Sequence, residues 1–451
     1  MVLNAGFPSI GRARAVAALV LVALAALLAV APGGARASVP PPAQDPFYRY
    51  TGTTPLADIA PGTVLKTRTV PYHVLGLPLP LKAVQLLYRS TGQIGQPTAD
   101  VTSIVRGVGG SASRRLLSYQ SFYDSLSPND QPSHAIAGGL TLGGAIPAVE
   151  TPMIAPFLFA GYSVAIPDTE GQTANFAAGP EYGKHTLDGV RAAFASPATG
   201  LASDAKVGLF GYSGGAIATE WASELAPSYA PDVDRRLVGA AMGGVLVHPA
   251  HNLHYVEGSQ VWAGVLPMAV VGIARGFQID LSQYLNDQGR RIYEKLKDAS
   301  IINVLGQYPG LTWKQMAKPE YATPESIPIY VETVNKLIMG TGGTPTTPLF
   351  VGQAANGDFE GTSSDKPGIG AGDGVMITGD VRSLARQYCA KGVKVEYQQY
   401  DVLSHFTAMV MWLPEATNWM MQRFDGRAAP QNCATIKPGN PLDPIAAPAA
   451  P

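Results

Sequence analysis

The sequence has few charged residues and no excess of either sign. Only 14% of its 451 residues are Asp, Glu, Lys or Arg, against about a quarter in an ordinary soluble chain. The 32 basic and 33 acidic residues nearly cancel, so no strongly basic surface is expected and nucleic acid is excluded as the main partner. Hydrophobic residues make up 46%, which supports a large core and excludes wholesale disorder.

Cysteine is almost absent, with Cys389 and Cys433 as the only two. Their wide separation lacks the C-x-x-C spacing of zinc and redox sites. In an oxidising compartment such a pair most simply forms one disulfide. The sequence therefore predicts a bond that ties the segment after Cys389 to the C-terminal tail.

The N-terminus predicts export. Two arginines precede the unbroken apolar run of residues 15–31, and Ala35-Arg36-Ala37 follows as a small-x-small cleavage signal. This is the layout of a secretory signal peptide, so residues 1–37 are expected to be removed from a secreted, extracellular protein. A membrane anchor is the alternative, but the run of 17 residues falls short of the about 20 that span a bilayer.

Strand-like and helix-like segments alternate along most of the chain. Apolar and β-branched runs predict strands at residues 63–69, 83–88, 100–105, 116–119, 162–166, 207–210, 237–241, 347–351 and 393–397. Helices are predicted at residues 185–193, 216–225 and 380–390. From about residue 140 the alternation predicts βαβ units, hence an α/β fold with a mostly parallel sheet and helices on both faces.

One segment interrupts this pattern and divides the predicted core. Residues 247–345 look mostly helical, with the clearest helix at residues 278–297. We therefore expect an α/β core in two parts, residues 38–246 and 346–433, with a helical lid or cap inserted between them. Residues 434–451 are rich in Pro and Ala and are expected to form a flexible tail.

The segment Gly211-Tyr212-Ser213-Gly214-Gly215 matches the motif G-x-S-x-G. A predicted strand precedes it and a predicted helix follows, which is the setting of a nucleophile elbow. Flanking glycines allow the tight turn, and the helix N-terminus directs free amides at a developing anion. Ser213 is the candidate nucleophile, and a structural serine in a glycine-rich turn is the alternative.

A serine hydroxyl needs a base, usually a histidine that a carboxylate orients. In this class of fold the chain order is serine, acid, histidine. Four of the seven histidines follow Ser213, and three of these lie at the start of the predicted cap, before any candidate acid. His405 lies in a loop after the last predicted strand and is therefore the candidate base.

The acid is expected in the long loop after the strand predicted at residues 347–351. We favour Asp373, which precedes an apolar run that leads into the next helix, and Asp358 is the alternative. The loop also contains Glu360 and Asp365. These two are expected to be solvated loop charges.

Two other features invite a functional interpretation. His248, His251 and His254 recur at every third residue, but Pro249 disfavours a continuous helix there and no nearby acid completes a ligand set, so no metal is expected. The apolar run of residues 261–277 suggests a membrane-contacting helix. Its proline and arginine argue against a span and favour a buried cap helix.

Several blocks of the sequence resemble the secretory lipase family of α/β-hydrolases. The match includes the elbow and its helix, Gly211 to Thr219, and blocks spread over most of the mature chain. These further blocks are Tyr119-Gln120-x-Phe122-x-Asp124, Asp168-x-Glu170-Gly171, Ala178-Gly179, Leu187-Asp188-Gly189-x-Arg191, Ser404-His405-x-Thr407-Ala408 and Phe424-Asp425-Gly426.

The resemblance implies an α/β-hydrolase fold, a helical lid before the acid, and cofactor-free hydrolysis of carboxylic esters including acylglycerols. Carried over by position, Ser213 is the nucleophile and His405 the general base. The backbone amides of Gly214 and Asp124 would form the oxyanion hole. Asp168 and Glu170 are expected to belong to a structural polar network.

The acid loop departs from the family pattern. Residues 356–372 look like an insertion between the strand and the acid, which leaves Asp373 and Asp358 both open. The expected partner is a lipid or ester small molecule, with possible contact to a lipid interface and no obligate protein partner. Two alternatives share the scaffold: an acyltransferase that uses an alcohol or lipid acceptor, and a non-catalytic binding module.

Overall fold

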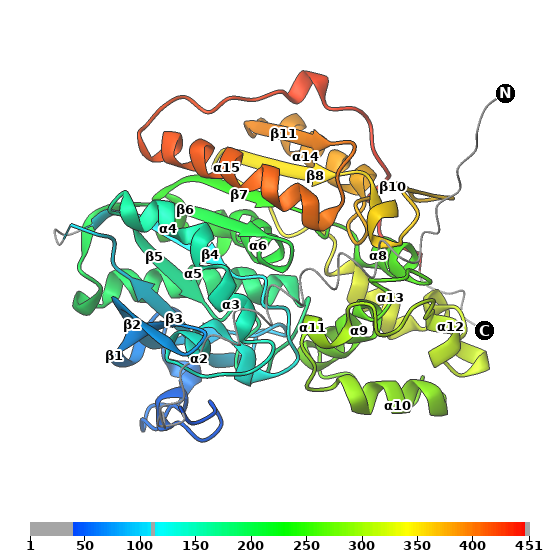
Figure 1. Cartoon of the computed structure of the whole chain (residues 1–451), viewed down its shortest axis with the longest axis horizontal. Coiled ribbons are helices and arrows are strands. Elements are labelled where there is room, and N and C mark those ends of the chain that lie inside the picture. The colour runs from blue at the N-terminus through cyan, green and yellow to red at the C-terminus, as the bar shows by residue number, and fades with distance from the viewer. Residues whose placement is uncertain (1–38, 110–112, 447–451) are drawn as a thin grey trace.

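The computed structural model describes residues 39–109 and 113–446 and is built around one large sheet (Figure 1). Nine strands follow the order β1-β2-β3-β5-β4-β6-β7-β8-β11 in this part of the chain. They are β1 (Val64–Val74), β2 (Leu77–Thr91), β3 (Pro97–Val105), β4 (Ser113–Gln120), β5 (Ser163–Pro167), β6 (Leu201–Tyr212), β7 (Leu237–Gly243), β8 (Leu349–Ala354) and β11 (Val395–Tyr400).

In the order of the sheet, the six strands from β5 to β11 are parallel to one another, whereas β1, β2 and β3 pair in antiparallel register. β1 pairs with β2, β2 with β3, and β3 with β5 in antiparallel register. β5, β4, β6, β7, β8 and β11 then pair with one another in parallel. Strands β5 and β8, each of which has a neighbour on both sides, are buried along their whole length, as expected for parallel strands that helices cover on both faces. The predicted α/β-hydrolase architecture is confirmed.

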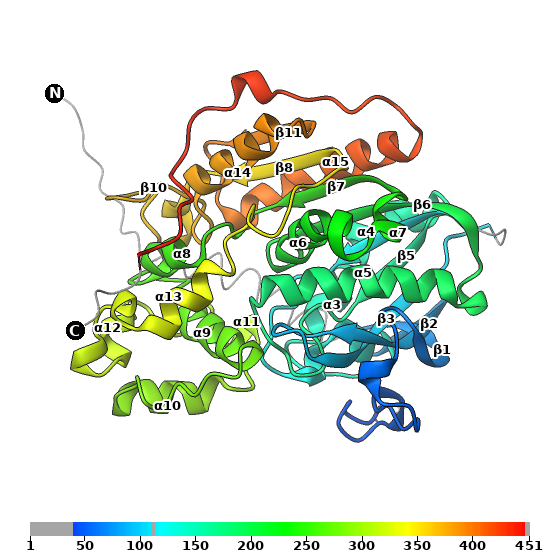
Figure 2. The same ribbon diagram turned by 180° about the vertical axis from the view of Figure 1, so that it is seen from behind.

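Helices cover the two faces of the sheet. Successive residues of β6 show this, because Leu209 packs in the cluster with α5 and α6, while Phe210 contacts Trp412 and Phe157 on the other face. Figure 2 shows α5 and α6 in front of the sheet, and Figure 1 shows α4 and α15 there. One face carries α5 (Gly179–Ala195), α6 (Gly214–Tyr229) and α14 (Thr378–Ala390), and the other carries α4 (Thr151–Phe159) and α15 (His405–Phe424).

Between β7 and β8 the chain leaves the sheet and forms a helical cap with its own hydrophobic cluster. Both views show the cap helices gathered beyond one end of the strands (Figures 1 and 2). The cap comprises α8 (Pro249–Val256), α9 (Val265–Gly276), α10 (Asp287–Leu296), α11 (Ile301–Val304), α12 (Trp313–Met316) and α13 (Pro328–Asn335).

Two cap segments differ in detail from their sequence-based expectations. The helix expected over residues 278–297 is shorter, because Gln278 adopts a left-handed φ of 57° and Asn286 caps α10 by accepting from the Gly289 amide. The apolar run 261–277 contains α9, which buries one side in the cap. No helix among the described residues is long and apolar enough to cross a bilayer.

The expected flexible tail is wrong for residues 434–446, which run along the core and the cap. The Ser383 hydroxyl and the Arg386 guanidinium of α14 donate to carbonyls of this segment at 2.5 and 2.7 Å. Asn335 of α13 exchanges two hydrogen bonds with the backbone of Ile445. Composition suggested a loose tail because a Pro- and Ala-rich segment forms no core of its own, yet the backbone carbonyls of Ile436, Asn440 and Ile445 accept side-chain donors. The predicted signal peptide, residues 1–37, and residues 447–451 lie outside the described residues.

The predicted disulfide between Cys389 and Cys433 is confirmed. Cys389 lies near the end of α14, and Cys433 begins the short helix η8 (Cys433–Thr435). Both pack against the core cluster beneath α14. The bond therefore fixes the point from which the C-terminal segment crosses to the cap.

Replacing both cysteines by serine tests this tether. A disulfide restrains the unfolded chain, so Cys389→Ser/Cys433→Ser should lower the free energy of unfolding by about 2–4 kcal/mol. Denaturant unfolding of both proteins, with and without a reductant, measures the effect. The reductant should lower the wild-type midpoint and leave that of the variant unchanged. A wild-type midpoint that is insensitive to reductant would contradict the stabilising role.

Candidate active site

Ser213 occupies a sharp turn between β6 and α6. Its φ of 55° and ψ of −121° lie outside the regions that non-glycine residues ordinarily adopt. A Cβ at Gly211 would lie 2.3 Å from the Gly215 carbonyl oxygen, and a Cβ at Gly215 would lie 2.0 Å from that of Gln120. Neither position has room for a side chain, which explains the G-x-S-x-G pattern sterically.

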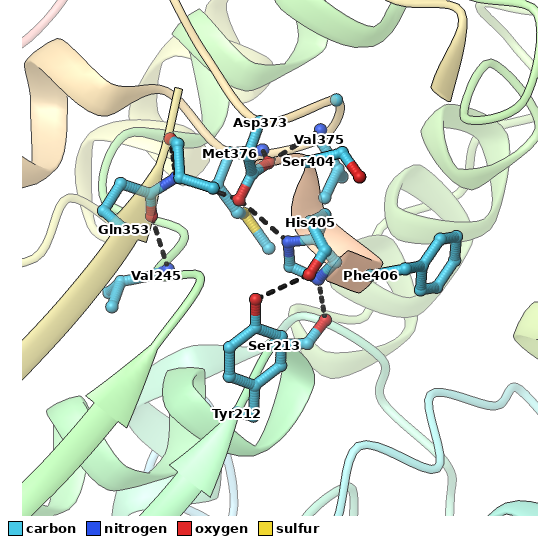
Figure 3. A network of polar contacts seen from close by, with 12 residues as sticks. Tyr212, Ser213, Val245, Gln353, Asp373, Val375, Met376, Ser404, His405 and Phe406 are labelled. Atoms are coloured by element: carbon cyan, nitrogen blue, oxygen red, sulfur yellow. Dashed lines mark hydrogen bonds and ion pairs between the residues drawn. The ribbon is translucent and has the colours of Figure 1, made fainter. Parts of the chain in front are cut away.

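The three residues predicted to work together lie in one hydrogen-bonded chain (Figure 3). His405 Nε2 is 2.8 Å from Ser213 Oγ, and His405 Nδ1 is 2.9 Å from Asp373 Oδ2. Because a carboxylate accepts at Nδ1, that nitrogen carries the proton and Nε2 is free to accept from serine. His405 begins α15, and its neighbour Ser404 forms the N-terminal capping box with Thr407.

Asp373 is fully buried, and polar groups replace the water that it loses. The amides of Val375 and Met376 donate to Oδ1 at 3.1 and 2.7 Å. Gln353 donates to Oδ2 at 2.9 Å. The backbone carbonyl of Asp373 also accepts from the His405 amide at 2.8 Å. The carboxylate is thus held at a fixed angle to the imidazole.

The surroundings of His405 shift the pKa of its imidazole in opposite directions, with a net rise. Burial lowers the pKa of the imidazole, but the charge and hydrogen bond of Asp373, with further charge from Glu360 and Asp124, raise it above its usual value. A nearby carboxylate stabilises the imidazolium that forms when serine gives up its proton.

The other acids of the long loop do not accept the hydrogen bond of His405 Nδ1. Asp358 is exposed and accepts from the Ser364 amide and hydroxyl at 2.8 and 2.7 Å, and Asp365 is exposed as expected. The expectation that Glu360 is a solvated charge is wrong, because it is 2% exposed. Nothing local distinguishes Glu360 in the sequence, since its partners come from the cap and from α15.

The predicted oxyanion residues lie beside Ser213. Gly214 begins α6, so its amide is among those left free at a helix N-terminus. Asp124 follows β4 with a φ of 36°, and a Cβ on Gly214 would lie 1.7 Å from Asp124 Oδ1. Burial, followed by the charge of Glu150, raises the pKa of Asp124, while His405 lowers it.

Buried carboxylates hold the loop that carries Asp124. Glu150 accepts from the Ser121 hydroxyl at 2.5 Å and the Phe122 amide at 2.8 Å. Glu170 accepts from the Ser125 amide at 3.1 Å, in line with the structural role expected for it. The cap adds a contact, since the Ile301 amide donates to the Asp124 carbonyl at 2.8 Å. No motif marks Glu150 in the sequence, and its role becomes visible only through these contacts.

The three cap histidines have separate partners. His251 Nδ1 contacts Asp380 at 3.0 Å, and His254 contacts Glu257 and Glu325 at 3.2 and 2.6 Å. His248 stacks on His251. Within the described part of the chain, no group of three or more His, Cys, Asp or Glu side chains is placed to hold a metal ion.

An apolar pocket opens at Ser213. It lies between α6, the cap helices α8 and α9, and the segment after Asp373. A second apolar pocket adjoins it under the cap, and Tyr330 and Val334 line both. The residues that line the first pocket include Ile217, Leu246, Val256, Trp262, Val265, Leu266, Val270, Val375 and Met376.

Comparison with known proteins places the chain in a family. The family model described as "Secretory lipase" matches residues 139–432. The chain belongs to the secretory lipase family. It is 31% identical to Lipase A of Arthroderma benhamiae, over 88% of this chain and 82% of that protein. It is also 31% identical to a Mycobacterium tuberculosis protein named "Probable inactive lipase", over 86% of this chain and 83% of that protein.

The solved structures agree with this assignment. Candida antarctica lipase A in its closed state matches with a TM-score of 0.75 and 28% identity, over 92% of this chain and 93% of that chain. The expected resemblance to the secretory lipase family of α/β-hydrolases is therefore confirmed. Membership of the secretory lipase family supports ester hydrolysis in general.

Replacing each of the two candidate acids separately by asparagine tests which one orients His405. Asp373→Asn would present an amide donor to Nδ1 and favour the tautomer with a proton on Nε2, so kcat for a chromogenic ester should fall by about 10³–10⁴-fold. Asp358→Asn, the matched control in the same loop, should leave kcat close to that of the wild type. Full activity in Asp373→Asn with loss in Asp358→Asn would reverse the assignment.

Proposed function

We propose that this secretory lipase is an exported carboxylic ester hydrolase that cleaves acylglycerols, with Ser213, His405 and Asp373 as its catalytic triad. The observation that carries the proposal is the chain of two hydrogen bonds, 2.8 and 2.9 Å long, that joins these residues at the mouth of an apolar pocket. No cofactor is needed for this chemistry.

The reaction proceeds by acyl transfer through the serine. Ser213 Oγ attacks the ester carbonyl while His405 Nε2 takes its proton. The oxyanion is stabilised by the amides of Gly214 and Asp124, each worth about 10²–10³ in rate. Collapse breaks the C–O bond, and His405 gives its proton to the departing alcohol. A water molecule then attacks the acyl-serine, with His405 as base again, and releases the acid.

The lining of the pocket supports an acyl chain as its occupant. Asp124 is the one acidic or basic side chain that lines it among the described residues, and apolar side chains, many of them from α6, α8 and α9, form most of the wall. Each buried methylene contributes about 0.8 kcal/mol, so binding should strengthen with chain length. The adjoining pocket beneath the cap offers room for a long chain.

The name of one relative supports an alternative function. Because a Mycobacterium tuberculosis relative is named "Probable inactive lipase", a non-catalytic binding module on the same scaffold is the second candidate function. The intact hydrogen-bonded chain at Ser213 favours the catalyst. The disulfide suits an oxidising compartment, which supports the proposed export.

A chromogenic ester series from acetate to palmitate tests the function. We expect kcat/KM to rise with chain length over the range that the apolar pocket accommodates. Ser213→Ala should lower the rate by about 10⁴-fold or more, because the nucleophile is gone. Ser228→Ala, an exposed serine at the end of the same helix, is the matched control and should keep wild-type activity.

Labelling with a fluorophosphonate separates the two candidate functions. The catalyst should form an adduct on Ser213 in the wild type and none in Ser213→Ala. Absence of both turnover and adduct in the folded wild type would favour the binding module.

A further inference from the structure

Glu360 lies beside the proposed base without belonging to the triad. It ends the short helix η7 (Gly357–Glu360) in the long loop after β8, within the segment whose sequence looks inserted. Only 2% of the residue is exposed. A carboxylate so deeply buried is costly unless it is well hydrogen-bonded, so its partners indicate what it does there.

Each oxygen of Glu360 has a different partner. Oε2 accepts from the indole Nε1 of Trp262 at 2.8 Å, and Oε1 accepts from the backbone amide of Phe406 at 2.8 Å. Trp262 belongs to the cap, between α8 and α9, whereas Phe406 follows His405 at the start of α15. One side chain therefore joins the cap to the element that carries the base.

Trp262 is in direct contact with the base. Its ring stands at 86° to the His405 imidazole, with 5.3 Å between centroids, and stacks on Phe406 at 5.0 Å. Aromatic pairs at such distances attract and have preferred orientations. Trp262 also lines the pocket that Ser213 faces, so it touches both the proposed substrate site and the imidazole.

The packing leaves this arrangement little freedom. Gly374, next to Asp373, has a φ of 125°. A Cβ there would lie 2.9 Å from Glu360 Oε2 and 3.0 Å from Trp262 Nε1. The Gln260 amide of the cap also donates to the Gly361 carbonyl at 3.0 Å. The acid loop, the cap and α15 thus meet at the Glu360 carboxylate.

We infer that Glu360 is a positioning residue, which holds Trp262 and the Phe406 amide so that the His405 imidazole keeps its place between Asp373 and Ser213. The inference rests on the proposed function, because it concerns the same base. It also makes the geometry of the base depend on the cap, since the indole donor comes from the cap. Glu360 itself contacts neither Ser213 Oγ nor His405 Nδ1 in the described hydrogen bonds.

The charge of Glu360 should also affect the pH dependence of activity, which a purely structural role would leave unchanged. The pKa of Glu360 is raised overall to about 7, because the effect of burial exceeds the opposing effects of the His405 charge and the Phe406 hydrogen bond, and Asp373 raises it further. The charged groups that face His405 are Asp373, Glu360 and Asp124. The buried phenols Tyr212 and Tyr255 also lie near Glu360, and their raised pKa values keep them neutral.

The charge of Glu360 determines the direction in which the pH dependence of activity should shift. Ionised Glu360 stabilises the imidazolium and so raises the pKa of His405. The base must be neutral to accept the serine proton, so activity is lost as the pH falls through that pKa. Removing the charge lowers the pKa of His405, and the acidic limb of kcat/KM moves to lower pH.

Two single variants and their combination test the inference. Glu360→Gln keeps the shape but leaves one of the two donors without an acceptor, and should lower kcat by about 10- to 100-fold with little change in KM. The acidic limb should move down by about half a unit or more. Trp262→Phe keeps an aromatic ring but removes the N–H donor together with the pyrrole part of the indole, and should also lower kcat. The double variant should be no worse than Glu360→Gln alone, because the two losses share one contact.

The controls separate positioning from general damage. Asp365→Asn, an exposed carboxylate in the same loop, should keep the kcat and acidic limb of the wild type. Because Glu360 is buried, thermal unfolding of each variant is measured as well. If Glu360→Gln does not fold, Trp262→Phe becomes the test of the inference. A folded Trp262→Phe variant with wild-type kcat would overturn it.

The outcomes also separate this inference from the proposed function. A wild type that is inactive on esters and unlabelled at Ser213 would overturn both. A wild type that acts through Ser213, with folded Glu360→Gln matching its kcat and acidic limb, would overturn the positioning role alone. Strictly additive losses in the double variant would do the same.

Discussion

The parallel run of the sheet is the constraint on which the site depends. Parallel strands end at the same edge, so the loops that follow them meet there. β4, β6, β8 and β11 are parallel, and the loops after them carry Asp124, Ser213, Asp373 and His405 respectively. Ser213 and His405 are 192 positions apart in the sequence, and this arrangement brings them within hydrogen-bond distance.

Buried carboxylates recur as the means by which each functional loop is held. Glu150 and Glu170 accept backbone amides on the two sides of Asp124. Asp373 accepts the amides of the two residues that follow Gly374, and Glu360 accepts the one after His405. Such groups stabilise only when all partners are in place, because an unpaired buried charge is costly. The loops are therefore rigid as long as the cap and core stay packed, which suits a site that must present preorganised donors.

Local patterns in the sequence were sufficient for some features and not for others. The elbow at Ser213 and the late position of His405 follow from motif and chain order, and the α/β alternation follows from hydrophobic periodicity. The burial of Glu360 does not, because its donors, Trp262 and Phe406, are distant in the sequence. The same applies to the tail, where residues 434–446 gain order from partners on α13 and α14 rather than from their own composition. Tertiary contacts of this kind produce no hydrophobic periodicity in the sequence from which they could be predicted.

The most direct test of the account is a crystal structure of the protein after reaction with an activated alkyl phosphonate ester, such as a p-nitrophenyl ester, whose p-nitrophenolate group is displaced by the serine and whose adduct mimics the tetrahedral intermediate. The account predicts a covalent bond to Ser213 Oγ, with the phosphoryl oxygen about 2.7–3.1 Å from the amides of Gly214 and Asp124 and the alkyl chain in the apolar pocket below α9. His405 should remain bonded to Asp373. A phosphonylated residue other than Ser213, or an adduct whose P=O oxygen is turned away from both amides, would contradict the account.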